Sequence, residues 1–123
     1  METLAVVALA VVAALHLGFL YLEMFLWQKP AGMRISRLDP ADAKTTATLA
    51  ANQGLYNGFI AAGLILGIFA SDPVPIRVFF LVCVIVAGLY GAITAGRTIL
   101  WVQAVPGVIG LALVLAAGQP SGL

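Results

Sequence analysis

The chain has 123 residues, of which 63% are hydrophobic and only 9% are charged. Water-soluble domains carry about a quarter charged residues, so this composition excludes that class and predicts a protein that lies in a lipid bilayer. The formal net charge of +1 offers no basic surface that could neutralise phosphates, which argues against a nucleic-acid partner. The chain has a single cysteine, Cys83, which excludes an intrachain disulfide.

The first apolar run covers residues 4–27 and is long enough to cross a membrane, since roughly 20 helical residues span the hydrocarbon core. Glu2 precedes this run where a cleaved signal peptide carries basic residues, so we expect a retained helix. Two ionisable residues interrupt the run, His16 and Glu23. They lie seven positions apart and therefore share one face of the helix.

The only sizeable polar connection follows, from Gln28 to Lys44, and we expect it to be a loop outside the membrane. Its second half predicts the start of a helix, because Asp39 suits the N-cap position and Pro40 suits the first turn. This second helix is expected over residues 40–70. It should stop at Ser71-Asp72-Pro73, which contains an N-cap residue and a helix breaker.

Two further apolar runs predict helices over residues 75–95 and 98–117. Only a short turn around Gly96 and Arg97 separates them, so they should be antiparallel neighbours. Small residues spaced four apart, among them Gly54 and Gly58 in the second helix, predict faces where helices approach one another closely.

The distribution of basic residues predicts the orientation of these helices. The first and third connections together hold five lysines and arginines, whereas the second holds one, Arg77. The positive-inside rule then places the first and third connections in the cytoplasm and both termini outside. The expected fold is all-α: a single four-span domain over residues 1–123, forming an integral membrane four-helix bundle with antiparallel up-down topology.

The stretch from Asn52 to Gly58 places three amides and a phenol in an otherwise apolar segment. In the expected orientation all four helices bring polar residues to the cytoplasmic half of the bilayer, and the outer half is almost wholly apolar. This asymmetry argues against a pore or an alternating-access transporter, which need polar groups reachable from both faces. It favours a cytoplasm-side pocket that binds or modifies a small lipophilic molecule. The candidate ligand-binding residues are Glu23, Asn52, Gln53, Tyr56, Asn57, Tyr90, Arg97 and Gln103.

His16 and Glu23 are the catalytic candidates, since an acid/base pair beside amide and phenol donors suits isomerisation or proton abstraction. Glu23 either forms a structural ion pair with Arg97 at the cytoplasmic rim, or Arg97 extends its charged end to the membrane interface without that partner. His16 is either a neutral histidine bonded to Asn57 or Tyr56, or a proton carrier with Glu23. Whether the protein is an enzyme stays open at this point.

No metal site and no cofactor are expected. One histidine, one cysteine and one carboxylate within the spans do not supply a metal-ligand set. There is no glycine-rich phosphate loop after a strand. Serine occurs only at Ser36, Ser71 and Ser121, all outside the expected spans, which excludes a buried serine nucleophile.

Four sequence blocks carry a family resemblance: His16 with residues 22–27, residues 52–58, residues 88–91, and Val102-Gln103 followed by Pro106. Together they resemble a small bacterial integral-membrane family catalogued as a domain of unknown function, number thirteen-oh-four. The resemblance covers nearly the whole chain and implies a four-span fold and a multi-pass location in the bacterial inner membrane. It implies no activity or ligand. The shared site that it implies consists of His16, Glu23, Asn52, Gln53, Tyr56, Asn57, Tyr90 and Gln103.

Residues 51–57 are also similar to the polar second helix of the four-span membrane enzymes of eicosanoid and glutathione metabolism, a likeness that implies trimeric packing. Those enzymes carry arginine and glutamate on that helix, and both are lacking here, so glutathione binding does not follow. The expected partners are membrane lipids, a small lipophilic molecule and further copies of the chain in a homo-oligomer. The alternative functions are a non-catalytic membrane scaffold or subunit, and a proton or small-solute transporter.

Overall fold

The computed structural model describes residues 1–118, and these are almost entirely helical with no strand among them. The all-α prediction is therefore confirmed. In chain order the elements are α1 (Glu2–Tyr21), the π-helical segment η1 (Leu22–Leu26), α2 (Pro30–Ser36), α3 (Pro40–Phe69), α4 (Pro73–Thr94), a second π-helical segment η2 (Leu100–Ala104) and α5 (Val105–Ala117).

Three helical stretches among the described residues are long and apolar enough to cross a membrane: Glu2–Leu26, Pro73–Thr94 and Leu100–Ala117. Their length and composition support a membrane protein. The long helix α3 is not among them. Its 30 residues include the amides of residues 52–57, which make this helix more polar than the other three. A bundle of four membrane-spanning helices with both termini outside therefore stays a prediction.

The chain divides into two compact units, and the boundaries fall inside α1 and inside α3. Unit 1 comprises Met1–Leu15 and Ile60–Leu123, and unit 2 comprises His16–Phe59. Unit 1 thus contains α4, η2 and α5 with the first part of α1 and the last part of α3. Unit 2 contains η1 and α2 with the remaining parts of α1 and α3.

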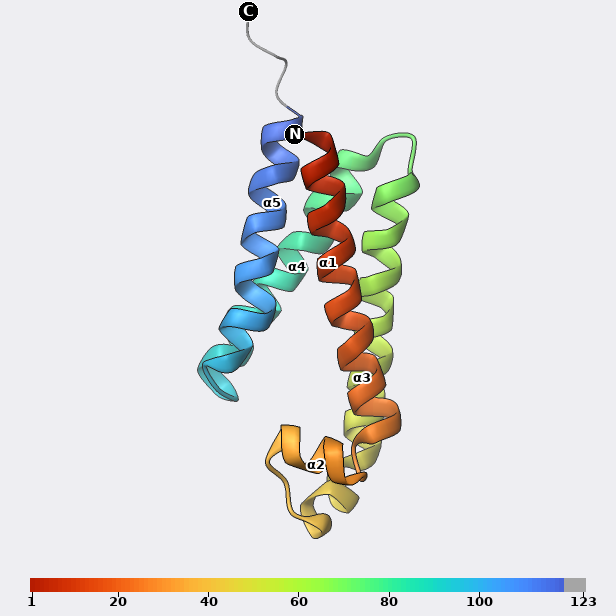
Figure 1. The fold of residues 1–123 in the computed structure, drawn as a ribbon, viewed down its shortest axis with the longest axis vertical. Coiled ribbons are helices and arrows are strands. Elements are labelled where there is room, and N and C mark those ends of the chain that lie inside the picture. The colour runs from red at the N-terminus through yellow and green to blue at the C-terminus, as the bar shows by residue number, and fades with distance from the viewer. Residues whose placement is uncertain (119–123) are drawn as a thin grey trace, which may run out of the picture. The chain divides into compact units, whose positions relative to one another are not determined.

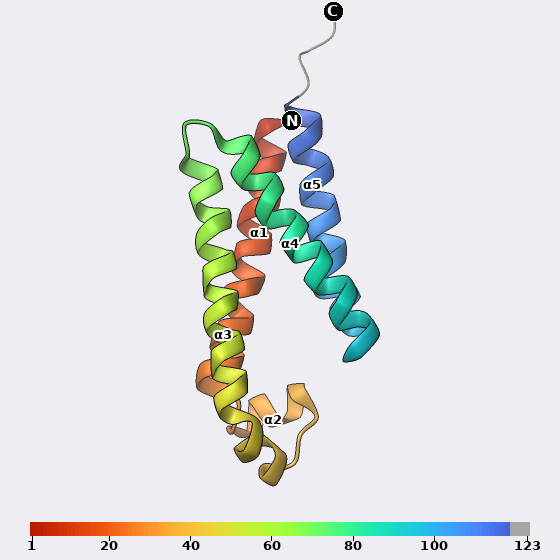
Figure 2. The same cartoon turned by 180° about the vertical axis from the view of Figure 1, so that it is seen from behind.

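The core of unit 1 is a cluster of buried aliphatic side chains from four helices. Figures 1 and 2 show α5 lying beside the first part of α1, and a Cβ added at Gly110 of α5 would lie 3.9 Å from Ala8 of α1. In a bilayer such contacts stabilise helix association through van der Waals packing rather than removal from water. The largest fully buried members are Leu9 from α1, Leu64 from α3, Leu81 from α4 and Val114 from α5.

Glycines bring α4 close to η2 and α5. A Cβ at Gly88 would lie only 2.6 Å from the backbone nitrogen of Ala104, so no larger residue fits there without a shift of the backbone. A Cβ at Gly107 would lie 3.0 Å from the side chain of Val84. Because later residues of α4 meet earlier residues of η2 and α5, the two helices are antiparallel. The turn between them contains Gly96 at a φ of +148°, a conformation that side chains disfavour.

Proline explains the π-helical segment η2. Pro106 has no N–H group and lies at the first turn of α5. The backbone just before it widens, and the N–H of Val105 donates to the carbonyl of Leu100, five residues earlier. Pro106 therefore disturbs the regular helix by widening the turn just before it.

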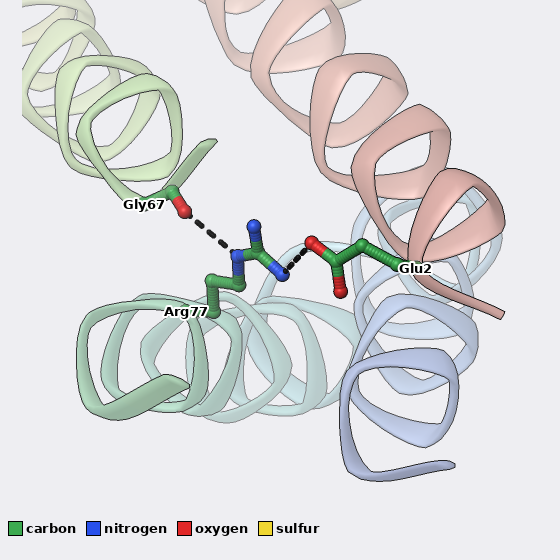
Figure 3. A network of polar contacts seen from close by, with 3 residues as sticks. All are labelled: Glu2, Gly67 and Arg77. Atoms are coloured by element: carbon green, nitrogen blue, oxygen red, sulfur yellow. Dashed lines mark hydrogen bonds and ion pairs between the residues drawn. The ribbon is translucent and has the colours of Figure 1, made fainter. Parts of the chain in front are cut away.

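Arg77 links three helices at one end of unit 1 (Figure 3). Its side chain is buried, and Nε donates to the carbonyl oxygen of Gly67 at 2.7 Å while Nη1 lies 2.7 Å from Oε1 of Glu2. Gly67 leaves room for the arginine stem, since a Cβ there would lie 3.0 Å from Arg77 Cγ. The prediction of membrane orientation counts Arg77 with the second connection. In the structure α4 begins at Pro73, so Arg77 lies within the helix.

Candidate functional site

Unit 2 holds the polar connection that the sequence predicted, with one difference. Asp39 caps α3, because the Asp42 N–H donates to Asp39 Oδ1 at 2.8 Å, which confirms the predicted helix start. The part before Asp39 was expected to be a loop and instead contains α2 (Figure 1). Pro30 begins this helix, and Arg37, at a φ of 56°, ends it by donating its N–H to the Met33 carbonyl. Its seven residues are too few to show a clear apolar period.

Glycines on α3 allow α1 and η1 to approach. A Cβ at Gly54 would lie 2.6 Å from Met24 Cγ and 3.2 Å from the carbonyl oxygen of Leu20. A Cβ at Gly58 would lie 2.8 Å from the Leu20 side chain. The close helix approach predicted at these two glycines is confirmed. It brings the amides of α3 within reach of η1.

One of those amides pairs with the carboxylate of η1. The Asn57 Nδ2 donates to Oε2 of Glu23 at 2.9 Å, and both side chains are half-buried. A charge-assisted bond of this kind is stronger than one between neutral groups. Glu23 belongs to a π-helical segment, and such segments are frequent at functional sites.

A cavity of about 270 Å³ lies beside Glu23, and we call it the Glu23 pocket. Its volume is just below the roughly 300–1,000 Å³ that is usual for small-molecule sites, so it suits a small ligand. The part of its wall that α3 supplies comes from one helical face, since these residues recur at intervals of three and four. The lining residues are Glu23, Trp27, Ser36, Leu38, Thr46, Leu49, Ala50 and Gln53.

A short hydrogen-bond chain holds Trp27 in this wall. The indole Nε1–H donates to Oγ1 of Thr46 at 2.9 Å, and the Thr46 hydroxyl donates to the carbonyl of Asp42 at 2.7 Å. Both side-chain donors are thereby used, and the indole is fixed against α3. Sequence reasoning placed neither Trp27 nor Thr46 in the site. Their spacing in the sequence could have indicated that they share a helical face with site residues. Trp27 lies four residues after Glu23, and Thr46 lies seven residues before Gln53.

Three other candidates of unit 2, Asn52, Tyr56 and His16, are not among the residues that line the pocket. Asn52 is exposed, and Tyr56 is 59% exposed with its ring edge-on to Phe59 at 5.7 Å. His16 is 1% exposed and packs edge-on against Phe19 at 5.4 Å. The predicted site residues that the structure brings together are therefore Glu23, Gln53 and Asn57.

The remaining three candidates belong to unit 1. Tyr90 lies on α4 and is 70% exposed, and its carbonyl accepts a hydrogen bond from the Thr94 hydroxyl at 2.8 Å. Arg97 is exposed in the turn between α4 and η2. Gln103 is half-buried on η2. These three residues therefore belong to a different unit from the Glu23 pocket.

The family model described as "Protein of unknown function (DUF1304)" matches residues 10–115, which include every candidate site residue. The chain belongs to this family. Its membership confirms the resemblance that the sequence blocks carry. A relative from Lactococcus lactis subsp. lactis (strain IL1403), "Uncharacterized protein YpaA", is 32% identical over 105 residues, which cover 82% of this chain and 88% of that protein. No solved structure matches the chain.

Proposed function

We propose that this member of the family is an integral membrane protein that binds a small lipophilic molecule in the Glu23 pocket. The observation that carries the proposal is a cavity whose lining combines apolar side chains with a few polar ones. Leu38, Leu49 and Ala50 supply apolar surface, and Glu23 with Gln53 supplies groups that orient a ligand. Ligand sites generally combine a mostly apolar lining with a few polar groups in this way.

The cost of placing Glu23 in an apolar helix supports a functional role. An ionisable side chain at the centre of a membrane helix costs about 2.5–3.5 kcal/mol on insertion scales, and less near the interface. The bond from Asn57 offsets only part of that cost, because it engages one of the two carboxylate oxygens. A ligand that bonds the other oxygen would offset more.

The basic residues of the connection between η1 and α3 support a cytoplasm-side position for the pocket. In this arrangement the protein is a multi-pass protein of the bacterial inner membrane, and α3 is its fourth span. The ligand then enters from the inner leaflet or the cytoplasm. Acid/base chemistry on the bound molecule would be a further step, with Glu23 as the group nearest to it.

The test is retention of a co-purifying molecule. The full chain is purified from membranes in mild detergent, and bound lipophilic compounds are extracted and quantified by mass spectrometry. We expect a compound at near-stoichiometric amount in the wild type and a several-fold loss in Gln53→Leu and Thr46→Val. Thr45→Val is the matched control, since Thr45 makes the same bond to its own helix, from Oγ1 to the Ala41 carbonyl, but is exposed and does not line the pocket.

Equal retention by all folded variants would contradict the proposal and favour the scaffold alternative, in which the polar residues serve assembly. Loss of folding in the pocket variants alone would favour the same alternative. The transporter alternative predicts a proton or solute flux in proteoliposomes that changes in Glu23→Gln. An unchanged flux would remove that alternative.

A further inference from the structure

We infer that the Glu23 pocket selects lipophilic cations: amines or quaternary ammonium compounds that carry a small apolar group. This inference rests on the proposed function and specifies its ligand. It follows from the charges, the hydrogen-bond groups and the aromatic ring that the pocket presents.

Charge comes first. Among the eight lining residues the one ionisable side chain is Glu23, and no lysine, arginine or histidine contributes to the lining. The surroundings are partly apolar, so the field of this carboxylate is screened less than it would be in water. A cationic ligand gains from that field, whereas an anionic ligand is repelled. A neutral ligand gains neither effect.

The hydrogen-bond groups point the same way. Within residues 1–118, Oε2 of Glu23 accepts a bond from Asn57, and no donor bonds its second oxygen, Oε1. The donors of Trp27 and Thr46 are already engaged with Thr46 and Asp42. The open group on the charged residue is therefore an acceptor, and the Ser36 hydroxyl of the lining can donate or accept. A protonated amine supplies an N–H that matches it, a quaternary ammonium ion meets it through charge alone, and the Gln53 amide can adapt to either donor or acceptor.

The aromatic wall suits the same ligand. Trp27 lines the pocket, and its indole is held in place by the bond to Thr46. Of the aromatic side chains, tryptophan attracts ammonium groups most strongly, and aromatic rings are a common means of recognising quaternary ammonium ligands. Because the ring is already fixed, the ligand does not have to order it on binding.

The chain allows a direct spectroscopic test. It contains two tryptophans, so Trp101→Phe leaves Trp27 as the single tryptophan of the full chain. This protein is placed in phosphatidylcholine nanodiscs, and its fluorescence is followed during titration with benzyltrimethylammonium. Neopentylbenzene, in which carbon replaces the nitrogen, is the neutral probe of the same shape. Both are titrated as mole fractions of the lipid phase.

We expect the cation to bind at least tenfold more tightly than the neutral probe, and Glu23→Gln to reduce the preference to less than threefold. Glutamine keeps a carbonyl oxygen for the Asn57 bond, so this change removes mainly the charge. Asp72→Asn removes the same formal charge from an exposed residue that makes no side-chain cap and does not line the pocket. It should keep the full preference.

Equal binding of both probes to the protein that retains Glu23 would overturn the inference and leave the proposed function standing. This comparison needs no change at Glu23, so it decides the matter even where Glu23→Gln does not fold. An equal loss of preference in Asp72→Asn would also overturn the inference, because the effect would then come from net charge. No response of Trp27 to either probe would overturn the inference and the proposed function together.

Discussion

Two charged side chains within the helices of this protein have contrasting surroundings. Arg77 is 3% exposed, and its donors meet the Gly67 carbonyl and the Glu2 carboxylate, so the charge is paired within the fold. Glu23 is half-buried, borders a cavity and has one oxygen bonded to Asn57. A fully paired charge is explained by the stability of the fold, whereas a partly paired charge beside a cavity is available to a ligand.

The bond between Glu23 and Asn57 should be measurable as a coupling energy. We expect Asn57→Leu to lower the free energy of unfolding by about 1 kcal/mol, which is below the roughly 1.5–3 kcal/mol usual for a bond to a charged group because both side chains are half-buried. In a double-mutant cycle with Glu23→Leu, the double variant should lose less than the sum of the two single changes. Reversible unfolding in detergent micelles, followed by circular dichroism, provides the measurement. Strict additivity would show that the bond adds nothing.

At the level of elements, glycines decide where the helices meet. Gly88 on α4 lies against the backbone of Ala104, where an added Cβ would come within 2.6 Å of a backbone nitrogen. Gly54 on α3 similarly faces the Leu20 carbonyl at 3.2 Å. Backbone atoms cannot rotate away as a flexible side chain can. These glycines therefore determine how closely the helices approach. In unit 2 the close approach of α3 to α1 and η1 brings Asn57 within hydrogen-bond distance of Glu23.

Replacing a glycine by alanine should change the stability of the protein in opposite directions at Gly88 and Gly18, because their surroundings differ. We expect Gly88→Ala to lower the free energy of unfolding by about 1–3 kcal/mol, because α4 and η2 must separate. Gly18 on α1 has no atom within 4 Å of an added Cβ, so Gly18→Ala should be neutral or stabilise by up to about 1 kcal/mol through helix propensity. Thermal unfolding of both variants in the same detergent tests this. An unchanged Gly88→Ala protein would rule out the close contact.

The two π-helical segments differ in how far the sequence predicts them. η2 precedes Pro106, whose missing N–H disturbs the regular helix, so a departure there was predictable. η1 contains no proline or glycine, and nothing in Leu22–Leu26 distinguishes it from a regular helix. Its position next to the Glu23–Asn57 bond and the Gly54 contact indicates that packing against α3 stabilises it.

For the whole molecule, the membrane topology depends on whether α3 crosses the bilayer together with the three apolar stretches. The polar residues 52–57 lower its apolar character, yet the basic residues before it and the short connection after it favour a crossing. The two ends of α3 would then lie on opposite sides of the bilayer. The connection after it, which contains Ser71, would face outward.

Cysteine labelling tests this topology. With Cys83→Ala as background, a single cysteine is placed by Ser71→Cys or by Lys44→Cys, both at exposed positions. In intact bacterial cells we expect a membrane-impermeant maleimide to label Ser71→Cys, and to label Lys44→Cys only after permeabilisation. The protein without cysteine should stay unlabelled. Labelling of both positions in intact cells would show that α3 does not cross, and labelling of Lys44→Cys alone would invert the orientation.

Composition and local signals were enough for the helical class, the apolar helices long enough to span a membrane, the cap at Asp39 and the close approach at Gly54 and Gly58. Each depends on features that act over a few residues: apolar run length, the side chain that meets a free N–H, and the absence of a Cβ. The polar residues of 52–58 marked α3 as unusual for the same reason. Family membership was readable from short blocks of sequence.

The tertiary structure decided which of the polar residues meet. Of the four polar residues at positions 52–57, Gln53 lines the pocket and Asn57 bonds Glu23, whereas Asn52 and Tyr56 do neither. That selection depends on the rotation of α3 against η1 and on the wider turn of η1, both of which come from contacts between segments more than 20 residues apart in the chain. Helical period defines a face, and only packing against a partner shows which part of that face becomes a site.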